Sequence, residues 1–79
     1  MDKVPVRAGL DIAKRVFALH AVNSAGETVL RKKINRKDVT SVIALMPRCV
    51  IGIESCGGSH FWARELKRLG HEVRLIAVK

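Results

Sequence analysis

The stretch over residues 6–14, VRAGLDIAK, constrains the fold of this chain more than any other. Its branched and small apolar side chains recur with a period of two, which is the period of a β-strand. They are Val6, Ala8, Leu10 and Ile12. Because the alternate positions are also mostly small, we expect a strand that is covered on both faces.

One carboxylate, Asp11, interrupts this strand near its end. A lone acid in a buried strand is costly unless it is paired, protonated or bound to a cation. Asp11 is therefore either a strand-end residue that hydrogen-bonds to a neighbouring loop or an acid with a chemical role.

Two further strands are predicted directly after the first, over residues 15–23 and 27–34. The Asn-Ser-Ala-Gly segment at 23–26 has the composition of a turn. The basic residues at 31–33 suggest that the third strand lies at an edge of the sheet. Short links between the three strands predict an antiparallel meander.

The second half of the chain alternates between helical and strand patterns. Apolar residues at helical spacing predict a helix over residues 38–46, and a continuous apolar run predicts a buried parallel strand over residues 49–54. Ser59 is the expected N-cap of a helix over residues 60–69. A fifth strand is predicted over residues 72–78.

The resulting element order is β-β-β-α-β-α-β, which places the chain in the α/β class. Right-handed crossovers put the fourth strand beside the first and the fifth beside the fourth. We therefore predict a mixed five-stranded sheet in the order 3-2-1-4-5. At 79 residues the chain is long enough for one domain at most.

This topology brings two acids, Asp11 and Glu54, to the carboxyl ends of adjacent strands, where ligands of open α/β sheets gather. Two neighbouring carboxylates repel each other unless one is protonated or a cation lies between them. Oxygen ligands of this kind suit Mg²⁺ or Mn²⁺. Such ions catalyse phosphodiester chemistry in many nucleic-acid enzymes.

The chain is strongly basic, with 15 Lys and Arg against seven Asp and Glu and a net charge of +8. This balance favours a polyanion, and nucleic acid in particular, as the partner.

No apolar run reaches the length of a transmembrane helix, and no signal peptide is visible. Cys49 and Cys56 are expected to be reduced thiols. We therefore predict a cytoplasmic protein with no membrane association. The expected nucleic-acid-binding residues are Lys14, Arg31, Lys32, Lys33, Arg64 and Lys67. The basic run at 31–33, together with Arg36 and Lys37, could follow a nucleic-acid backbone, although a solvated edge strand explains it equally well.

Four segments together resemble the insertion sequence 110 family of transposases. They read GLDIAK at 9–14, GIESCGG at 52–58, WAREL at 62–66 and GHEVRLI at 70–76. The resemblance implies a ribonuclease-H-like (RuvC-like) fold with a four-acid Asp-Glu-Asp-Asp site for divalent metal, in which Asp11 is the first acid and Glu54 the second. It also implies action on DNA, guided by a bridge-type RNA, in site-specific recombination during DNA transposition.

The sequence departs from this family in what it does not contain. The third and fourth acids of the family follow the fifth strand, and the domain that carries its serine nucleophile follows later. We therefore expect residues 1–79 to be the N-terminal part of a RuvC-like catalytic domain, a half-domain that is inactive alone. Part of its apolar sheet face should be exposed and should favour a homo-oligomer.

Two other functions remain open at this stage. One is a non-catalytic module that binds nucleic acid through its basic surface alone. The other is the first half of an actin-like ATPase or sugar kinase, which shares the three-strand start. The residues that follow Asp11 count against a kinase, because they contain no glycine before Arg15, and so does the basic charge.

Overall fold

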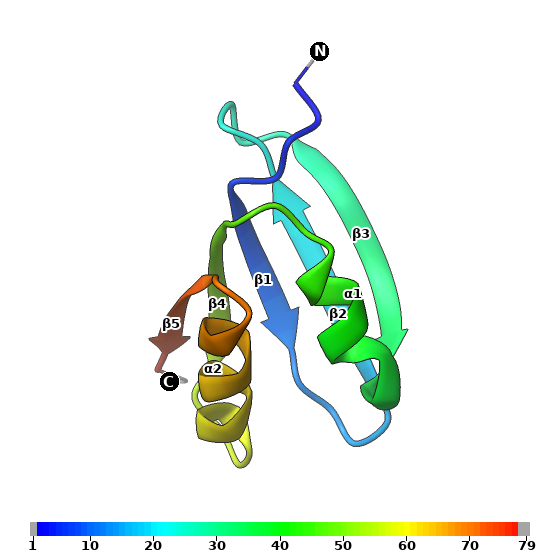
Figure 1. Cartoon of the computed structure of the whole chain (residues 1–79), viewed down its shortest axis with the longest axis vertical. Coiled ribbons are helices and arrows are strands. Elements are labelled where there is room, and N and C mark those ends of the chain that lie inside the picture. Colours follow the sequence, from blue (N-terminus) through cyan, green and yellow to red (C-terminus); the bar gives the residue numbers. More distant parts are fainter. Residues whose placement is uncertain (1, 78–79) are drawn as a thin grey trace.

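The computed structural model describes residues 2–77, which form one five-stranded sheet in the order β3-β2-β1-β4-β5 (Figure 1). Strand β1 (Arg7–Asp11) pairs antiparallel with β2 (Val16–Val22), and β2 pairs antiparallel with β3 (Thr28–Asn35). On its other side β1 pairs in parallel with β4 (Val50–Glu54), which pairs in parallel with β5 (Glu72–Ile76). The predicted α/β class, element order and strand order are confirmed, and they are those of a ribonuclease-H-like fold.

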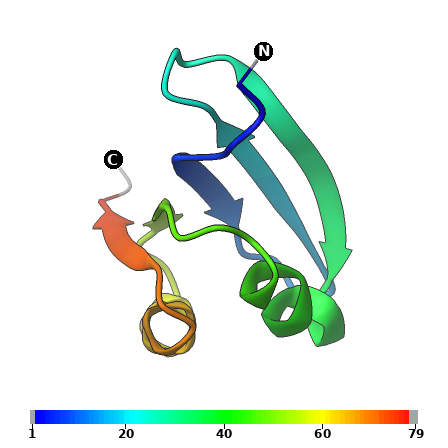
Figure 2. The same cartoon turned by 45° about the horizontal axis from the view of Figure 1, so that its top comes forward.

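Both α-helices cover the same face of the sheet. Helix α1 (Val39–Ala44) follows a 3₁₀ turn, η1 (Arg36–Asp38), and helix α2 (Ser59–Arg68) connects β4 to β5. Figure 2 shows the two helices on one side of the sheet. The core lies between them and the strands, and its largest members are Leu10, Phe17, Leu19, Ile34, Ile43, Ile51, Ile53, Trp62 and Leu66.

The prediction that β1 is covered on both faces is wrong for the described part of the chain. Leu10 is buried, but its neighbours Gly9 and Asp11, which point to the opposite face, are exposed. Gly9 lies opposite Gly52 of β4 on this open face. Small residues at these positions resemble those of a buried strand in composition, although here they border solvent.

The open face is mixed rather than uniformly apolar. Val16 and Ile76 are 44% and 54% exposed on it. A Cβ atom on Gly52 would come within 2.9 Å of Ile76 Cδ1, so the Ile76 side chain lies over Gly52. Charged residues such as Arg7 interrupt these apolar positions. Self-association through this face therefore stays a prediction.

Several element boundaries differ from the predicted ones. Strand β1 ends at Asp11, because residues 12–15 form the loop to β2. The first helix begins two residues early, as a 3₁₀ turn at Arg36, and the α-helical part ends at Ala44. Strand β5 ends at Ile76, and position 78, included in the predicted strand, lies outside the described residues.

Ser59 does not cap helix α2 as predicted. The N-cap is Gly58, whose φ of 86° is in the left-handed region that glycine tolerates best. Ser59 is instead the first helical residue and is fully buried. Its hydroxyl accepts a hydrogen bond from the Cys56 N–H (3.2 Å) and donates one to the Cys56 carbonyl (2.7 Å), which ties the side chain to the preceding turn.

A buried histidine connects the second half of the fold. After Gly70 ends α2 with a φ of 99°, His71 lies 5% exposed between β4, α1 and β5. Its Nδ1 accepts the Cys49 N–H (3.3 Å), and its Nε2 lies 3.0 Å from the Ile43 carbonyl. These two contacts require the neutral tautomer in which Nε2 carries the proton and donates to Ile43.

Candidate functional site

The two acids singled out by the sequence end neighbouring parallel strands. Leu10 of β1 lies opposite Ile53 of β4, and Asp11 and Glu54 each follow by one residue. Neighbouring strands in a sheet are about 4.8 Å apart. The structure therefore brings the two backbone positions next to each other at one end of the sheet, where β1 and β4 finish.

Side-chain alternation sends both carboxylates to the same face. Asp11 and Glu54 lie two residues beyond the Gly9–Gly52 pair, so both side chains point to the open face, away from the helices. Both residues are exposed. Within residues 2–77 neither carboxylate forms an ion pair or a side-chain hydrogen bond, so their oxygens are available to a ligand.

The donor set fits a hard divalent cation. Two carboxylates from adjacent strands are the oxygen ligands that Mg²⁺ and Mn²⁺ prefer. Across the described part of the chain, no group of three or more His, Cys, Asp or Glu residues converges to hold a metal ion. The pair can therefore supply only part of a coordination shell, and water or phosphate oxygens would have to supply the remainder.

The six basic residues predicted to bind nucleic acid do not form one surface. Lys14 lies in the loop after β1, at the same end of the sheet as the acids. On β3, Arg31 and Lys33 pair with His20 and Ala18 and so share the open face, whereas Lys32 pairs with Leu19 and lies on the helix side. The remaining two, Arg64 and Lys67, are exposed on α2.

One basic residue of helix α2 is already paired within the helix. Arg68 donates a hydrogen bond to Glu65 Oε2 at 2.9 Å. This hydrogen bond lowers the pKa of the half-buried Glu65 carboxyl. Such surface pairs contribute little to stability, and this one leaves Arg64 and Lys67 free of an ion pair within the described residues.

Sequence reasoning missed a groove at this end of the molecule, here called the basic–aromatic groove. It is lined by Lys14, Arg15, Asn35, Arg36, Lys37, Phe61 and Trp62. These residues come from three stretches that are far apart in the chain: the β1–β2 loop, the junction of β3 and η1, and the start of α2. Of these residues, the sequence predicts Lys14 as a nucleic-acid contact and offers Arg36 and Lys37 as part of a basic run, but it gives no sign that Phe61 and Trp62 lie beside them.

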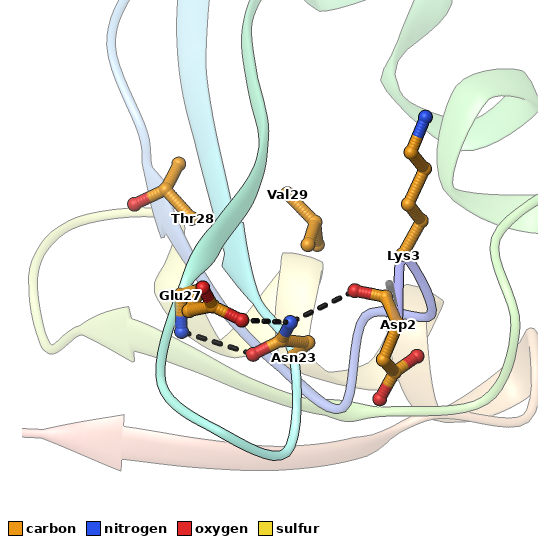
Figure 3. A pocket seen from close by; sticks show the side chains of 6 residues that line it. All are labelled: Asp2, Lys3, Asn23, Glu27, Thr28 and Val29. Carbon is orange, nitrogen blue, oxygen red and sulfur yellow. Dashed lines mark hydrogen bonds between the residues drawn. The ribbon is translucent and has the colours of Figure 1, made fainter.

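A pocket at the opposite end of the sheet contains two more acids, Asp2 and Glu27, whose carboxylates already accept hydrogen bonds from neighbouring residues (Figure 3). Buried Asn23 donates from Nδ2 to the Asp2 carbonyl (2.8 Å) and to Glu27 Oε1 (3.1 Å). Its Oδ1 accepts from the backbone N–H groups of Ala25 (3.0 Å) and Glu27 (2.9 Å). The Asn23 amide therefore has its full complement of four hydrogen bonds, and this pocket is a structural clamp on the segment before β1.

None of the helices in residues 2–77 has the length and apolar character needed to cross a membrane.

The chain is similar in sequence to several bacterial transposases. It is 47% identical to a putative transposase of Sinorhizobium fredii over 91% of this chain, and 46% identical to a probable family 20 transposase of Pseudomonas aeruginosa over 90%. It is 42% identical over 87% of its length to the transposase of insertion sequence element IS1328 of Yersinia enterocolitica. The chain spans only about a fifth of each relative: 19%, 21% and 21% of their lengths. No protein-family model matches it.

Proposed function

We propose that this chain contributes two metal ligands, Asp11 and Glu54, to the catalytic domain of a DEDD transposase of the insertion sequence 110 type. The complete enzyme acts on DNA in transposition, with a bridge-type RNA as a partner, in the cytoplasm. Similarity to transposases over about nine-tenths of the chain supports the proposal. The observation that carries it is the register of β1 and β4, which puts Asp11 and Glu54 at neighbouring strand ends on one face of the sheet.

The arrangement suits phosphodiester chemistry. Mg²⁺ or Mn²⁺, when bound here, would supply Lewis-acid stabilisation of the negative charge that develops on the reacting phosphate. Asp11 and Glu54 hold their oxygens toward solvent on the open face. Beside them, a Cβ on Gly9 would meet no atom within 4 Å, so a DNA backbone can approach the acids without meeting a side chain there.

Two carboxylates make an incomplete site. Mg²⁺ demands six ligands in near-octahedral geometry. In the proposed complete site two further acids take part in the coordination, so this chain alone should bind metal weakly and should not cleave or join DNA. Whether copies of the chain associate is a separate part of the proposal.

Titration with Mn²⁺, followed by electron paramagnetic resonance of the free ion, tests this function. Asp11→Asn and Glu54→Gln should each weaken binding by at least about tenfold, since each removes one of two charged ligands. The matched control is Glu72→Gln, which changes an acid on the same face at the other end of the sheet. Equal Mn²⁺ affinity in all four proteins would overturn the proposal, whereas competition by Mg²⁺ at the same site would support it.

The non-catalytic nucleic-acid-binding module is the second candidate, and the net charge of +8 favours it. It differs from the first in one measurable respect. A module of this kind binds DNA in a salt-sensitive manner but shows no Mn²⁺ binding that depends on Asp11 or Glu54.

A further inference from the structure

The basic–aromatic groove is a shallow depression of about 630 Å³ at the end of the sheet where β1 and β4 finish. The β1–β2 loop forms one side, η1 another, and the first turn of α2 a third (Figure 1). Lys14 follows Asp11 by three residues, so the groove and the acid pair share this end of the sheet. They open on different faces, because the acids point away from α2.

The groove is strongly cationic. Its cations are Lys14, Arg15, Arg36 and Lys37, all of them exposed, and among residues 2–77 no acid lines it. Four cations without a balancing carboxylate match a chain of phosphates and repel other cations. Contacts of this kind give nucleic-acid binding its dependence on salt.

An aromatic side chain is presented to solvent beside these cations. The Phe61 ring is 49% exposed and packs edge-to-face on Trp62, with ring centroids 5.3 Å apart. Trp62 is buried and packs in turn on Phe17, with centroids 5.1 Å apart. Phe61 is therefore held by an aromatic stack that reaches into the core while about half of the residue stays accessible.

One of the cations is held in place by the same stack. The Arg36 guanidinium carbon lies 5.8 Å from the Phe17 ring centroid and 5.9 Å from that of Trp62. Both distances are within the range of cation–π attraction. Arg36 is thereby positioned beside the exposed aromatic ring, in the arrangement that single-stranded nucleic-acid sites use to hold a base and its phosphate.

We propose that the basic–aromatic groove binds an unpaired segment of nucleic acid, with one base stacked on Phe61 and its neighbouring phosphates on Lys14, Arg36 and Lys37. The unpaired state follows from the chemistry, because the faces of bases within a duplex are already covered by stacking. The proposal deepens the proposed function, since it assumes a nucleic-acid substrate and names its single-stranded form. A nucleic-acid strand held in this groove would pass the end of the sheet at which Asp11 and Glu54 lie.

Trp62 provides a direct assay, because it is the only Trp and the chain contains no Tyr. The probe is an oligothymidylate of about ten nucleotides, the site size of one small single-strand-binding domain. Binding is followed by Trp62 fluorescence in the full chain. Phe61→Leu should weaken binding by roughly 5- to 150-fold, the range that corresponds to removing one stacking aromatic. The control is Leu45→Ala, which changes an 87% exposed apolar residue at the C-cap of α1, outside the groove.

An abasic strand of equal length separates stacking from charge. It should bind the unchanged chain about as weakly as oligothymidylate binds Phe61→Leu, and Phe61→Leu should not weaken it further. A duplex of the same length should also bind more weakly than the single strand. Lys37→Gln should lower the salt slope by about 0.7, as expected for one lost phosphate contact.

Three outcomes would overturn the groove proposal: equal affinity for the abasic strand, tighter binding of the duplex, or Phe61-dependent binding of a polyglutamate peptide. The Mn²⁺ titration decides the proposed function independently. If Asp11 and Glu54 bind metal but Phe61→Leu binds oligothymidylate as tightly as the unchanged chain does, only the groove proposal is refuted. If oligothymidylate binding depends on Phe61 but no metal binds, the groove proposal stands and the proposed metal-dependent transposase function is refuted.

Discussion

Replacing Asp11 by Asn should stabilise this chain when no divalent cation is present. The two carboxylates follow the Leu10–Ile53 pair by one residue and extend from adjacent strands on the same open face. Two like charges about 5 Å apart repel by about 0.8 kcal/mol in bulk water. Cross-strand pairs measured in sheets fall between about 0.2 and 1 kcal/mol. We therefore expect Asp11→Asn, and equally Glu54→Gln, to raise the free energy of unfolding by about 0.5–1 kcal/mol.

Thermal unfolding followed by circular dichroism at low ionic strength measures this effect. For a domain of this size, 1 kcal/mol corresponds to a shift in Tm of about 4–8 °C. The gain should shrink in about 1 M salt, where the Debye length falls to about 3 Å. Glu72→Gln is the control: it removes the surface pair with Arg74 (2.7 Å) and should leave Tm unchanged or slightly lower.

Mn²⁺ should reverse the order of stability. A ligand at ten times its Kd stabilises the folded state by about 1.4 kcal/mol, and only the chain with both acids should gain this amount. If Asp11→Asn and Glu54→Gln are no more stable than Glu72→Gln without metal, the two carboxylates do not interact, and the argument for a shared cation site fails.

Two further expectations concern residues outside the groove and the acid pair. His71→Ala should lower the free energy of unfolding by about 3–4 kcal/mol in urea titrations, because it leaves the Cys49 N–H and the Ile43 carbonyl buried without partners; a cost similar to that of His20→Ala, at an exposed histidine, would refute this reading. Burial raises the pKa of the Cys49 thiol, so Cys56 alone should react with a thiol reagent in the folded chain, and both should react after unfolding. Fast modification of both thiols in the folded chain would contradict this protection of Cys49. Because the raised pKa keeps the Cys49 thiol neutral in the fold, the contribution of this thiol to stability is complete below about pH 8.5 and falls as the pH rises through the folded pKa.

The topology was predictable because local signals agreed along the chain. The period-two pattern of the first three segments and the short turn at 23–26 indicate a meander, and the right-handed crossover rule fixes the position of β4 beside β1. The adjacency of Asp11 and Glu54 follows from these two features alone. To predict this part of the candidate site, one needs only the strand order and the face on which alternate residues lie. The periodicity of the sequence indicates both.

Other features depend on tertiary context that periodicity does not encode. Gly9 and Gly52 suit a buried strand by composition, yet both lie on the open face because the two helices pack on the other. Ser59 precedes a helical pattern as an N-cap would, but its hydroxyl bonds back to Cys56 and Gly58 takes the cap. The basic–aromatic groove escaped prediction because its residues converge from three segments that are separate in the chain.

His71 shows the same limit in a single residue. Its position directly after the glycine that ends α2 is a signal, because this place in a helix C-terminal motif commonly packs against the helix. Its two hydrogen-bond partners, Cys49 and Ile43, lie 22 and 28 residues away in the chain. No local pattern connects them, so the residue was given no role from the sequence.

Paramagnetic broadening by Mn²⁺ in the amide spectrum of the labelled chain tests the central claim most directly, because it locates the ion. Substoichiometric Mn²⁺ should first broaden the amides next to Asp11 in β1 and Glu54 in β4, and Mg²⁺ should restore them. The amides around Asp2 and Glu27, in the pocket at the opposite end, should stay sharp. Broadening centred on that distant pocket, or spread evenly over all exposed acids, would contradict a divalent cation held jointly by these two strands.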